Sequence, residues 1–189
     1  MNLSQLHHYW FGKVVITPRY YETHVPRWFF GQDESFDRGC QAFTDLLTRD
    51  DLGEQTPQER VAQILLFDQI PRNSFRQTAR AFTFDQRARD LSSRALQDGL
   101  EKDLTLPERL FLYMPFEHAE DLAFQELSVA KFEELHLAAP TSIRDWTQLA
   151  LDKAHSHHIT IQRFGRFPQR NLALGRTSTP PELEYLSTL

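Results

Sequence analysis

The stretch that decides the fold class covers residues 56–76 and reads TPQERVAQILLFDQIPRNSFR. Its first four residues form a capping box with proline at the first helical position, a combination typical of a helix start. Apolar side chains then recur three and four residues apart, the period of one helix face, at Val61, Ile64 and Leu65. Proline lacks the amide hydrogen that a helix interior needs, so we expect Pro71 to end this helix.

Similar patterns predict helices along most of the chain. Their expected ranges are about 3–11, 33–47, 77–97, 105–136 and 143–164, with a short last helix opened by a capping box at 179–182. Pro115 is expected to kink or restart its helix, and residues 12–31 are expected to be irregular. Residues 13–17 (KVVIT) are the only strand candidate. The predicted fold class is therefore all-α, with about six or seven helices packed as antiparallel neighbours.

The composition fits one globular domain, residues 1–189. Of the 189 residues, 40% are hydrophobic and 25% are charged, the balance of a folded protein rather than of a disordered or collagen-like chain. No apolar run is long enough for a membrane span, and the first residues lack the pattern of a signal peptide. The single cysteine, Cys40, fits a reducing compartment, so a cytoplasmic location is expected. A net charge of −5 argues against general nucleic-acid binding.

Polar residues on apolar helix faces are the informative exceptions, because burying a polar group without a partner costs free energy. Asp68 falls on the apolar face of the helix that starts at Thr56 and is expected to point inward. Helical spacing also places several polar side chains of residues 117–121 on one side. The candidates that this criterion selects are Asp68, Glu117, His118, Asp121, His155 and His158.

Arginine supplies 17 of the 21 basic residues. Its planar guanidinium suits paired contacts with carboxylate or phosphate groups. One group of arginines follows Asp68 closely, and a second lies in residues 155–178, which contain no acidic residue. The arginines singled out are Arg72, Arg76, Arg166 and Arg170.

Three segments resemble the signature of a known family. They are DQIPRNSFR (68–76), YMPFEHAEDL (113–122) and FGRFPQRN (164–171), followed by LGRTST (174–179). In this order they resemble the uncharacterised, mostly bacterial family DUF924, over nearly the whole chain. The resemblance implies a tetratricopeptide-like fold, a right-handed stack of antiparallel helix pairs, and brings no established activity, cofactor or catalytic residue. The family motif has a histidine where Gln169 stands here, which weakens any proposal that needs a base at that position.

The first functional hypothesis is a small-molecule site where the three segments meet, at which a small anionic ligand is bound or turned over. Glu117 and His118 are the candidate catalytic residues, with Asp68 or Asp121 as the group that orients them, because a histidine beside a carboxylate can transfer protons near neutral pH. The expected ligand-binding residues are Asp68, Arg72, Asn73, Arg76, Asp121, His155, His158, Arg166, Arg170 and Asn171. No metal and no cofactor are expected at this site.

Two alternatives stay open. The same charged residues can form buried salt bridges that only hold helices together. A tetratricopeptide-like stack can also present an arginine-lined groove to an acidic peptide and act as a protein–protein interaction scaffold. Whether the protein is an enzyme, and its oligomeric state, are left undecided by the sequence.

Metal and RNA binding receive little support from the sequence. The two acid-x-x-His pairs, Glu133–His136 and Asp152–His155, are about as many as chance gives in a chain of this composition. The segment IQRFGRFPQR (161–170) interleaves arginine with phenylalanine, but its phenylalanines are more simply core anchors. Cys40 lies on an apolar helix face and is interpreted as a buried small hydrophobe rather than a nucleophile.

Overall fold

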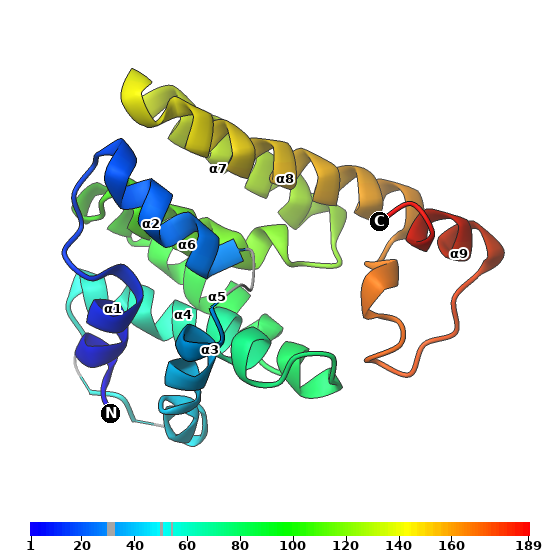
Figure 1. Cartoon of the computed structure of the whole chain (residues 1–189), viewed down its shortest axis with the longest axis horizontal. Helices are drawn as coiled ribbons and strands as arrows, with labels where there is room; N and C mark the ends of the chain where they lie inside the picture. The colour runs from blue at the N-terminus through cyan, green and yellow to red at the C-terminus, as the bar shows by residue number, and fades with distance from the viewer. Residues whose placement is uncertain (30–32, 50, 54) are drawn as a thin grey trace.

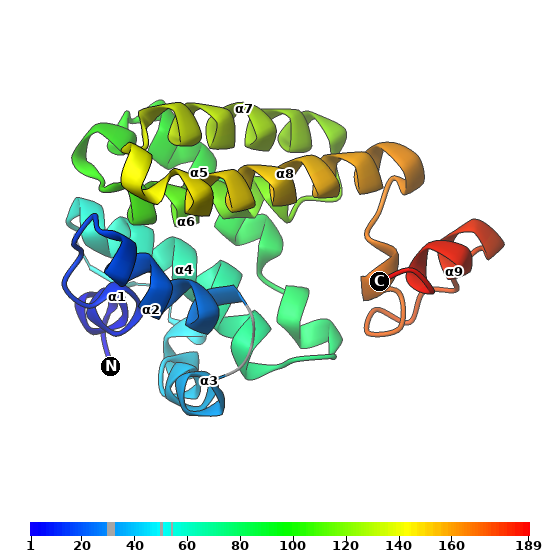
Figure 2. The ribbon, with the colours of Figure 1, turned by 45° about the horizontal axis from the view of Figure 1, so that its top comes forward.

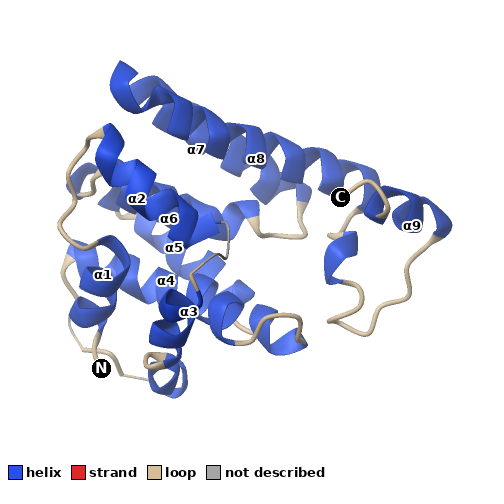
Figure 3. Ribbon diagram, in the orientation of Figure 1, coloured by secondary structure: helices blue, strands red, loops and turns tan. Residues whose placement is uncertain are grey.

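The computed structural model describes residues 1–29, 33–49, 51–53 and 55–189. In these residues the chain forms nine α-helices, five short 3₁₀-helices and no strand (Figure 3). The α-helices are α1 (Leu3–Phe11), α2 (Pro18–Phe29), α3 (Glu34–Gln41), α4 (Pro57–Ser74), α5 (Asp85–Gln97), α6 (Leu106–Glu117), α7 (Leu122–Ala138), α8 (Arg144–Phe164) and α9 (Pro180–Leu186). The all-α prediction is confirmed, but six or seven helices were too few, and residues 13–17 do not form a strand.

The helix α2 was missed in the sequence analysis. It occupies most of the stretch predicted to be irregular, whose last two residues, 30 and 31, lie outside the described part of the chain. The prediction was wrong because Pro26 lies inside α2, and a proline removes one helical hydrogen bond. One face of α2 is nevertheless buried, at Tyr20, Tyr21, Val25 and Trp28. The apolar area buried there offsets the lost hydrogen bond.

The central helices α4 and α6 both run through a proline. The predicted end of α4 at Pro71 is wrong, because the helix continues to Ser74. In the same way α6 passes through Pro115 and ends at Glu117. Both helices are buried on nearly every face, and α4 contacts α1, α3, α5 and α6. The free energy gained by this packing offsets the helical hydrogen bond that each proline removes. A helix buried all round must bury its polar residues too, which brings Asp68 into the interior.

Local cap signals predicted most helix starts correctly. Capping boxes form at Thr56, Thr105 and Thr179. The side chain of Asp33 accepts a hydrogen bond from the amide of Phe36 and caps α3. Gly165 ends α8 in the left-handed conformation, with φ of 68°.

Three further helices differ in extent from the prediction. The helix expected over 33–47 ends at Gln41, and a separate 3₁₀ turn, Thr44–Thr48, follows it. The helix expected from residue 77 begins only at Asp85, because Gln77 has a φ of 61° that no helix can contain. A 3₁₀ turn, Ala79–Phe82, fills part of the gap. The long helix expected over 105–136 breaks at residues 118–121 rather than at Pro115, and the side chain of Asp121 caps the start of α7.

The helices pack in layers (Figures 1 and 2). The two ends of the chain lie on opposite sides of the molecule (Figure 1). α7 and α8 pack side by side as an outer pair over α6, while α1 and α3 pack against α4. The turn Thr141–Ile143, just before α8, contacts α2, so α2 and α8 begin at the same end of the bundle. The segment after α8 carries α9 on the side of the molecule away from α1 (Figure 1), and Phe167 in this segment is fully buried. None of the described helices is long and apolar enough to cross a membrane.

Gly39 marks a close approach of α1 and α3, and replacing it tests that packing. A Cβ atom at Gly39 would clash with the hydroxyl of Tyr9, which donates a 2.8 Å hydrogen bond to the carbonyl of Phe36. We expect Gly39→Ala to lower the free energy of unfolding by about 1–3 kcal/mol in urea denaturation, although alanine favours a helix by about 1 kcal/mol. On a Tyr9→Ala background the same change should no longer destabilise. A single variant more stable than the natural protein would contradict the close approach.

Candidate functional site

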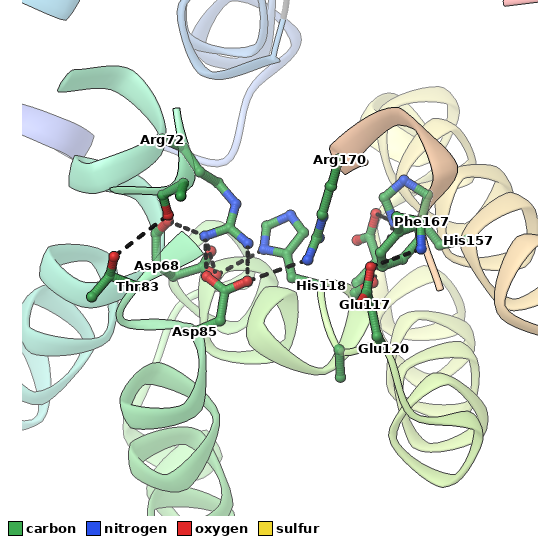
Figure 4. Close-up of polar contacts among 12 residues, drawn as sticks. Asp68, Arg72, Thr83, Asp85, Glu117, His118, Glu120, His157, Phe167 and Arg170 are labelled. Atoms are coloured by element: carbon green, nitrogen blue, oxygen red, sulfur yellow. Dashed lines mark hydrogen bonds and ion pairs between the residues drawn. The ribbon is translucent and has the colours of Figure 1, made fainter. Parts of the chain in front are cut away.

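The site is centred on a hydrogen-bonded pair, the buried Asp68 and the partly buried His118. Asp68 lies in the middle of α4 and is 1% exposed, and His118 directly follows the last residue of α6. Nδ1 of His118 lies 2.8 Å from Oδ1 of Asp68 (Figure 4). A carboxylate can only accept, so Nδ1 of His118 carries the proton and donates it. Nε2 of His118 forms no hydrogen bond with any residue that the structure describes.

The electrostatics fix the charge state of this pair. Burial raises the pKa of the Asp68 carboxyl, but Arg72 and His118 outweigh burial and hold that pKa well below its usual range. Burial, and then the positive charge of Arg72, lower the pKa of His118. At neutral pH the pair is therefore a carboxylate beside a neutral imidazole. The free lone pair on Nε2 of His118 can accept a proton.

Arg72 connects this pair to α5. Its Nη1 lies 3.3 Å from Oδ1 of Asp68, and its two terminal nitrogens donate to the two oxygens of Asp85 at 2.8 and 2.9 Å. Asp85 is the first residue of α5, where the helix dipole favours a negative charge. Arg170, from the segment after α8, reaches the same carboxylate at 3.3 Å (Figure 4). Arg72 and Arg170 thus share the carboxylate of Asp85.

A second histidine–carboxylate pair lies next to the first. Nδ1 of His157, on α8, lies 3.0 Å from Oε1 of Glu117, and the rings of His118 and His157 have centroids 6.4 Å apart. Glu120 accepts a 2.8 Å hydrogen bond from the backbone amide of Phe167 and pairs with both terminal nitrogens of Arg176. The three segments singled out in the sequence therefore meet in one polar cluster (Figure 4).

An apolar cavity of about 330 Å³ opens beside this cluster, between α2, α6, α7 and α8. Glu117, His118 and His157 form part of its wall. The rest is mostly aliphatic and aromatic, and includes Tyr21, Trp28, Leu106, Leu110, Phe132 and Trp146. Glu117 and His157 meet near the ends of α6 and α8, whereas Leu106 and Trp146 lie near their starts, so the cavity has one polar and one apolar end. Its volume lies at the lower end of the range for ligand sites, roughly 300–1,000 Å³.

Comparison with known proteins places the chain in a family. Residues 6–189 match the family described as "Bacterial protein of unknown function (DUF924)". This protein belongs to the DUF924 family. The resemblance drawn from the three sequence segments is thereby confirmed. A solved structure titled "Structure of Protein of Unknown Function ATU0120 from Agrobacterium tumefaciens" is 27% identical, covers 99% of this chain and 97% of its own, and superposes with a TM-score of 0.71. No curated protein matches the chain.

Five of the twelve residues predicted for the site of this DUF924 protein come together. They are Asp68, Arg72, Glu117, His118 and Arg170. Asp121 is exposed and caps α7 instead. Glu117 does not pair with His118, as the sequence analysis had suggested, but with His157. The predicted acid–base pair is therefore two separate histidine–carboxylate pairs.

The other predicted arginines lie apart from the cluster. Arg76 pairs with Asp37 on α3, at 2.8 Å, with its side chain half exposed. Arg166 pairs with Glu182 on α9, at 2.6 Å, and Asn171 donates hydrogen bonds to Ser178 and Glu182. The contacts of Arg166 and Asn171 hold the segment after α8 to α9, and the contact of Arg76 joins the end of α4 to α3.

The remaining three predicted residues of this DUF924 protein also lie outside the cluster. The Asn73 amide lies 3.6 Å from the thiol of Cys40. His155 is exposed and His158 is half-buried, and neither side chain forms a hydrogen bond within the described ranges of the chain. Cys40 itself is fully buried, as interpreted from the sequence, and burial raises its pKa to about 12, so the thiol stays protonated.

Four polar residues of the cluster were not among the predicted site residues: Asp85, Glu120, His157 and Arg176. Asp85 had a signal, because it lies at the edge of the apolar stripe that contains Ala88. Glu120 and His157 had none, since their partners lie 56 and 40 positions away along the chain. In the part of the chain that the structure describes, no three His, Cys, Asp or Glu side chains are arranged to hold a metal ion.

Proposed function

We propose that this DUF924 protein binds a small, largely apolar molecule in the cavity between α2, α6, α7 and α8, and that His118 takes a proton from it. One observation carries the proposal: a neutral histidine, held in one tautomer by a buried carboxylate, lines an apolar cavity, and its Nε2 has no hydrogen-bond partner among the described residues. A general base oriented by a second group has this arrangement. His118 is the candidate catalytic residue, and Asp68 is its positioning residue.

The second histidine pair supports a proton-transfer role. His157 and Glu117 also line the cavity, and the ring of His157 lies 6.4 Å from that of His118 between centroids. A ligand group that reaches Nε2 of His118 therefore lies near a second imidazole, whose Nδ1 faces the carboxylate of Glu117 in the same way. Titratable groups gathered in the wall of one cavity are typical of acid–base sites.

The wall of the cavity offers another group that lacks a partner. Tyr21 is 2% exposed and lines the cavity, and its hydroxyl forms no hydrogen bond with the described residues. A buried hydroxyl without a partner costs about 1–3 kcal/mol, and a polar atom of a bound ligand would recover part of that free energy. The unpaired hydroxyl thus favours an occupied cavity.

The anionic ligand and the acidic peptide of the sequence hypotheses depend on free arginines. Arg72 and Arg170 share Asp85, Arg76 pairs with Asp37, and Arg166 pairs with Glu182. An arginine-bound anion would have to compete with these carboxylates. The apolar cavity is therefore the site we favour, and the tetratricopeptide-like stack with a peptide groove stays a prediction.

Two matched probes test the proposed function, 4-ethylphenol and ethylbenzene, which differ by one hydroxyl that can donate to His118. Trp28 and Trp146 line the cavity, so their fluorescence reports binding. We expect 4-ethylphenol to bind about two- to tenfold more tightly, the effect of one hydrogen bond. His118→Phe should abolish this preference, whereas His155→Phe, on the exposed face of α8, should keep it.

A measurement on the natural protein avoids dependence on a variant that folds poorly. The ¹⁵N resonance of His118 Nε2 should move when 4-ethylphenol is added and not when ethylbenzene is added. Ala150→Phe, which fills the cavity wall, should block both probes. Equal affinity for the two probes together with an unmoved His118 resonance would contradict the role of His118. Binding that Ala150→Phe leaves unchanged would place the ligand elsewhere.

A further inference from the structure

We infer that the ligand of this cavity is an amphipathic carboxylic acid of about ten non-hydrogen atoms, and that Lys153 binds its carboxylate. The inference rests on the proposed function and names the class of its ligand. Three observations support it: the lysine in the cavity wall, the exposed apolar side chains beside it, and the volume of the cavity.

Among the described residues, Lys153 is the cation of the cavity wall that has no ion-pair partner. It lies on α8 one turn before His157, lines the cavity and is exposed to solvent. It forms no ion pair with any residue in the described ranges. Among the described residues that line the cavity, Glu117 is the one carboxylate, and its Oε1 lies 3.0 Å from Nδ1 of His157 rather than beside the lysine. A ligand carboxylate therefore meets an ammonium group that no described carboxylate already holds.

The exposed part of the wall is otherwise apolar. Phe29 and Leu149, both large hydrophobic side chains, line the cavity and are 39% and 36% exposed. Burying such surface against an apolar body is favourable, and roughly 25 cal/mol is gained for each Å² removed from water. A single cation beside exposed apolar side chains matches a molecule with a charged head and an apolar body. A wholly polar anion such as inorganic phosphate does not fit this surface.

The volume sets the size of the apolar body. A volume of about 330 Å³ corresponds to on the order of ten water-sized groups at roughly 30 Å³ each. Octanoate has this size, and its alcohol, 1-octanol, has the same chain without the charge. The two compounds separate the contribution of the carboxylate from that of the apolar chain.

The experiment titrates octanoate and 1-octanol into the natural protein, Lys153→Gln and Lys102→Gln, with the fluorescence of Trp28 and Trp146 as the readout. Lys102 is an exposed lysine outside the cavity wall and serves as the matched control. We expect Lys153→Gln to weaken octanoate binding about three- to tenfold, as for an ion pair partly shielded from water, and to leave 1-octanol unchanged. The octanoate affinity of the natural protein should also fall as salt is raised, and that of 1-octanol should not.

Each other outcome overturns a defined part of the reasoning. Equal affinities for octanoate and 1-octanol in all three proteins overturn the carboxylic-acid ligand and leave the proposed cavity site standing. Octanoate binding that Lys102→Gln weakens as much as Lys153→Gln overturns the assignment of Lys153. Absence of binding by both compounds overturns the proposed function together with this inference.

Discussion

Replacing Arg72 by alanine should lower the free energy of unfolding by about 3–5 kcal/mol, the range for breaking a buried ion pair by removing one partner. The side chain of Arg72 is 15% exposed and contacts two carboxylates, Asp68 and Asp85. Without it, Asp68 retains only His118 and Gln69 as side-chain hydrogen-bond partners in the described part of the chain, and neither supplies the permanent charge of a guanidinium. An ionised carboxylate in the interior with no cation beside it is strongly destabilising. Urea denaturation followed by circular dichroism measures the loss.

Arg76→Ala is the matched control for this prediction. Arg76 lies one turn after Arg72 and also holds a carboxylate with two nitrogens, that of Asp37. Its side chain is 50% exposed, so water screens the pair, and we expect a loss of about 0–1 kcal/mol. If the two variants lose the same stability, the cluster around Arg72 is not the buried network that its geometry indicates.

Acidification should destabilise the protein in two steps. Above pH 6.5, the ordinary value for histidine, His118 is neutral in both the folded and the unfolded chain. Its pKa is lowered on folding by burial and by Arg72, so below pH 6.5 the unfolded chain binds more protons and stability falls. The second step begins near pH 4, because the folded-state pKa of Asp68 lies far below its ordinary value of 3.8. A carboxylate paired in this way contributes about 2–3 kcal/mol at neutral pH, and that contribution is lost as the pH falls further.

Other groups act in the same direction. Burial lowers the pKa of His24, and hydrogen bonds lower the pKa values of Glu108 and Glu120 despite their burial. The Asp68→Asn variant separates the contribution of Asp68 from those of the other groups. It should be less stable than the natural protein at pH 7, and it should lose less stability than the natural protein between pH 4 and pH 2. Thermal unfolding at a series of pH values measures both profiles. Identical acid profiles for the two proteins would show that Asp68 does not titrate with folding.

The fold was predictable where the signal was local. The caps at Thr56, Thr105 and Thr179 lie within four residues of the groups they satisfy, and the structure contains all three. The prolines misled the prediction for the opposite reason. Pro26 and Pro71 weaken a helix locally, but both lie in segments whose neighbours are buried by distant parts of the chain. Tertiary packing therefore overrides the local preference, and no sequence window contains that information.

The candidate site, like the fold, was predictable only where the signal was local. The sequence by itself determined the all-α class and the family. It also placed Asp68 and His118 on apolar helix faces, which predicts that both polar side chains point inward. That they bind each other, 50 positions apart, and that Glu117 pairs with His157, was decided only by the tertiary structure. The cavity was invisible beforehand, because its wall combines residues from four helices that look like ordinary core in the sequence. Helix periodicity specifies which side of a helix is buried, but the partner across the interface depends on how all the helices pack at once.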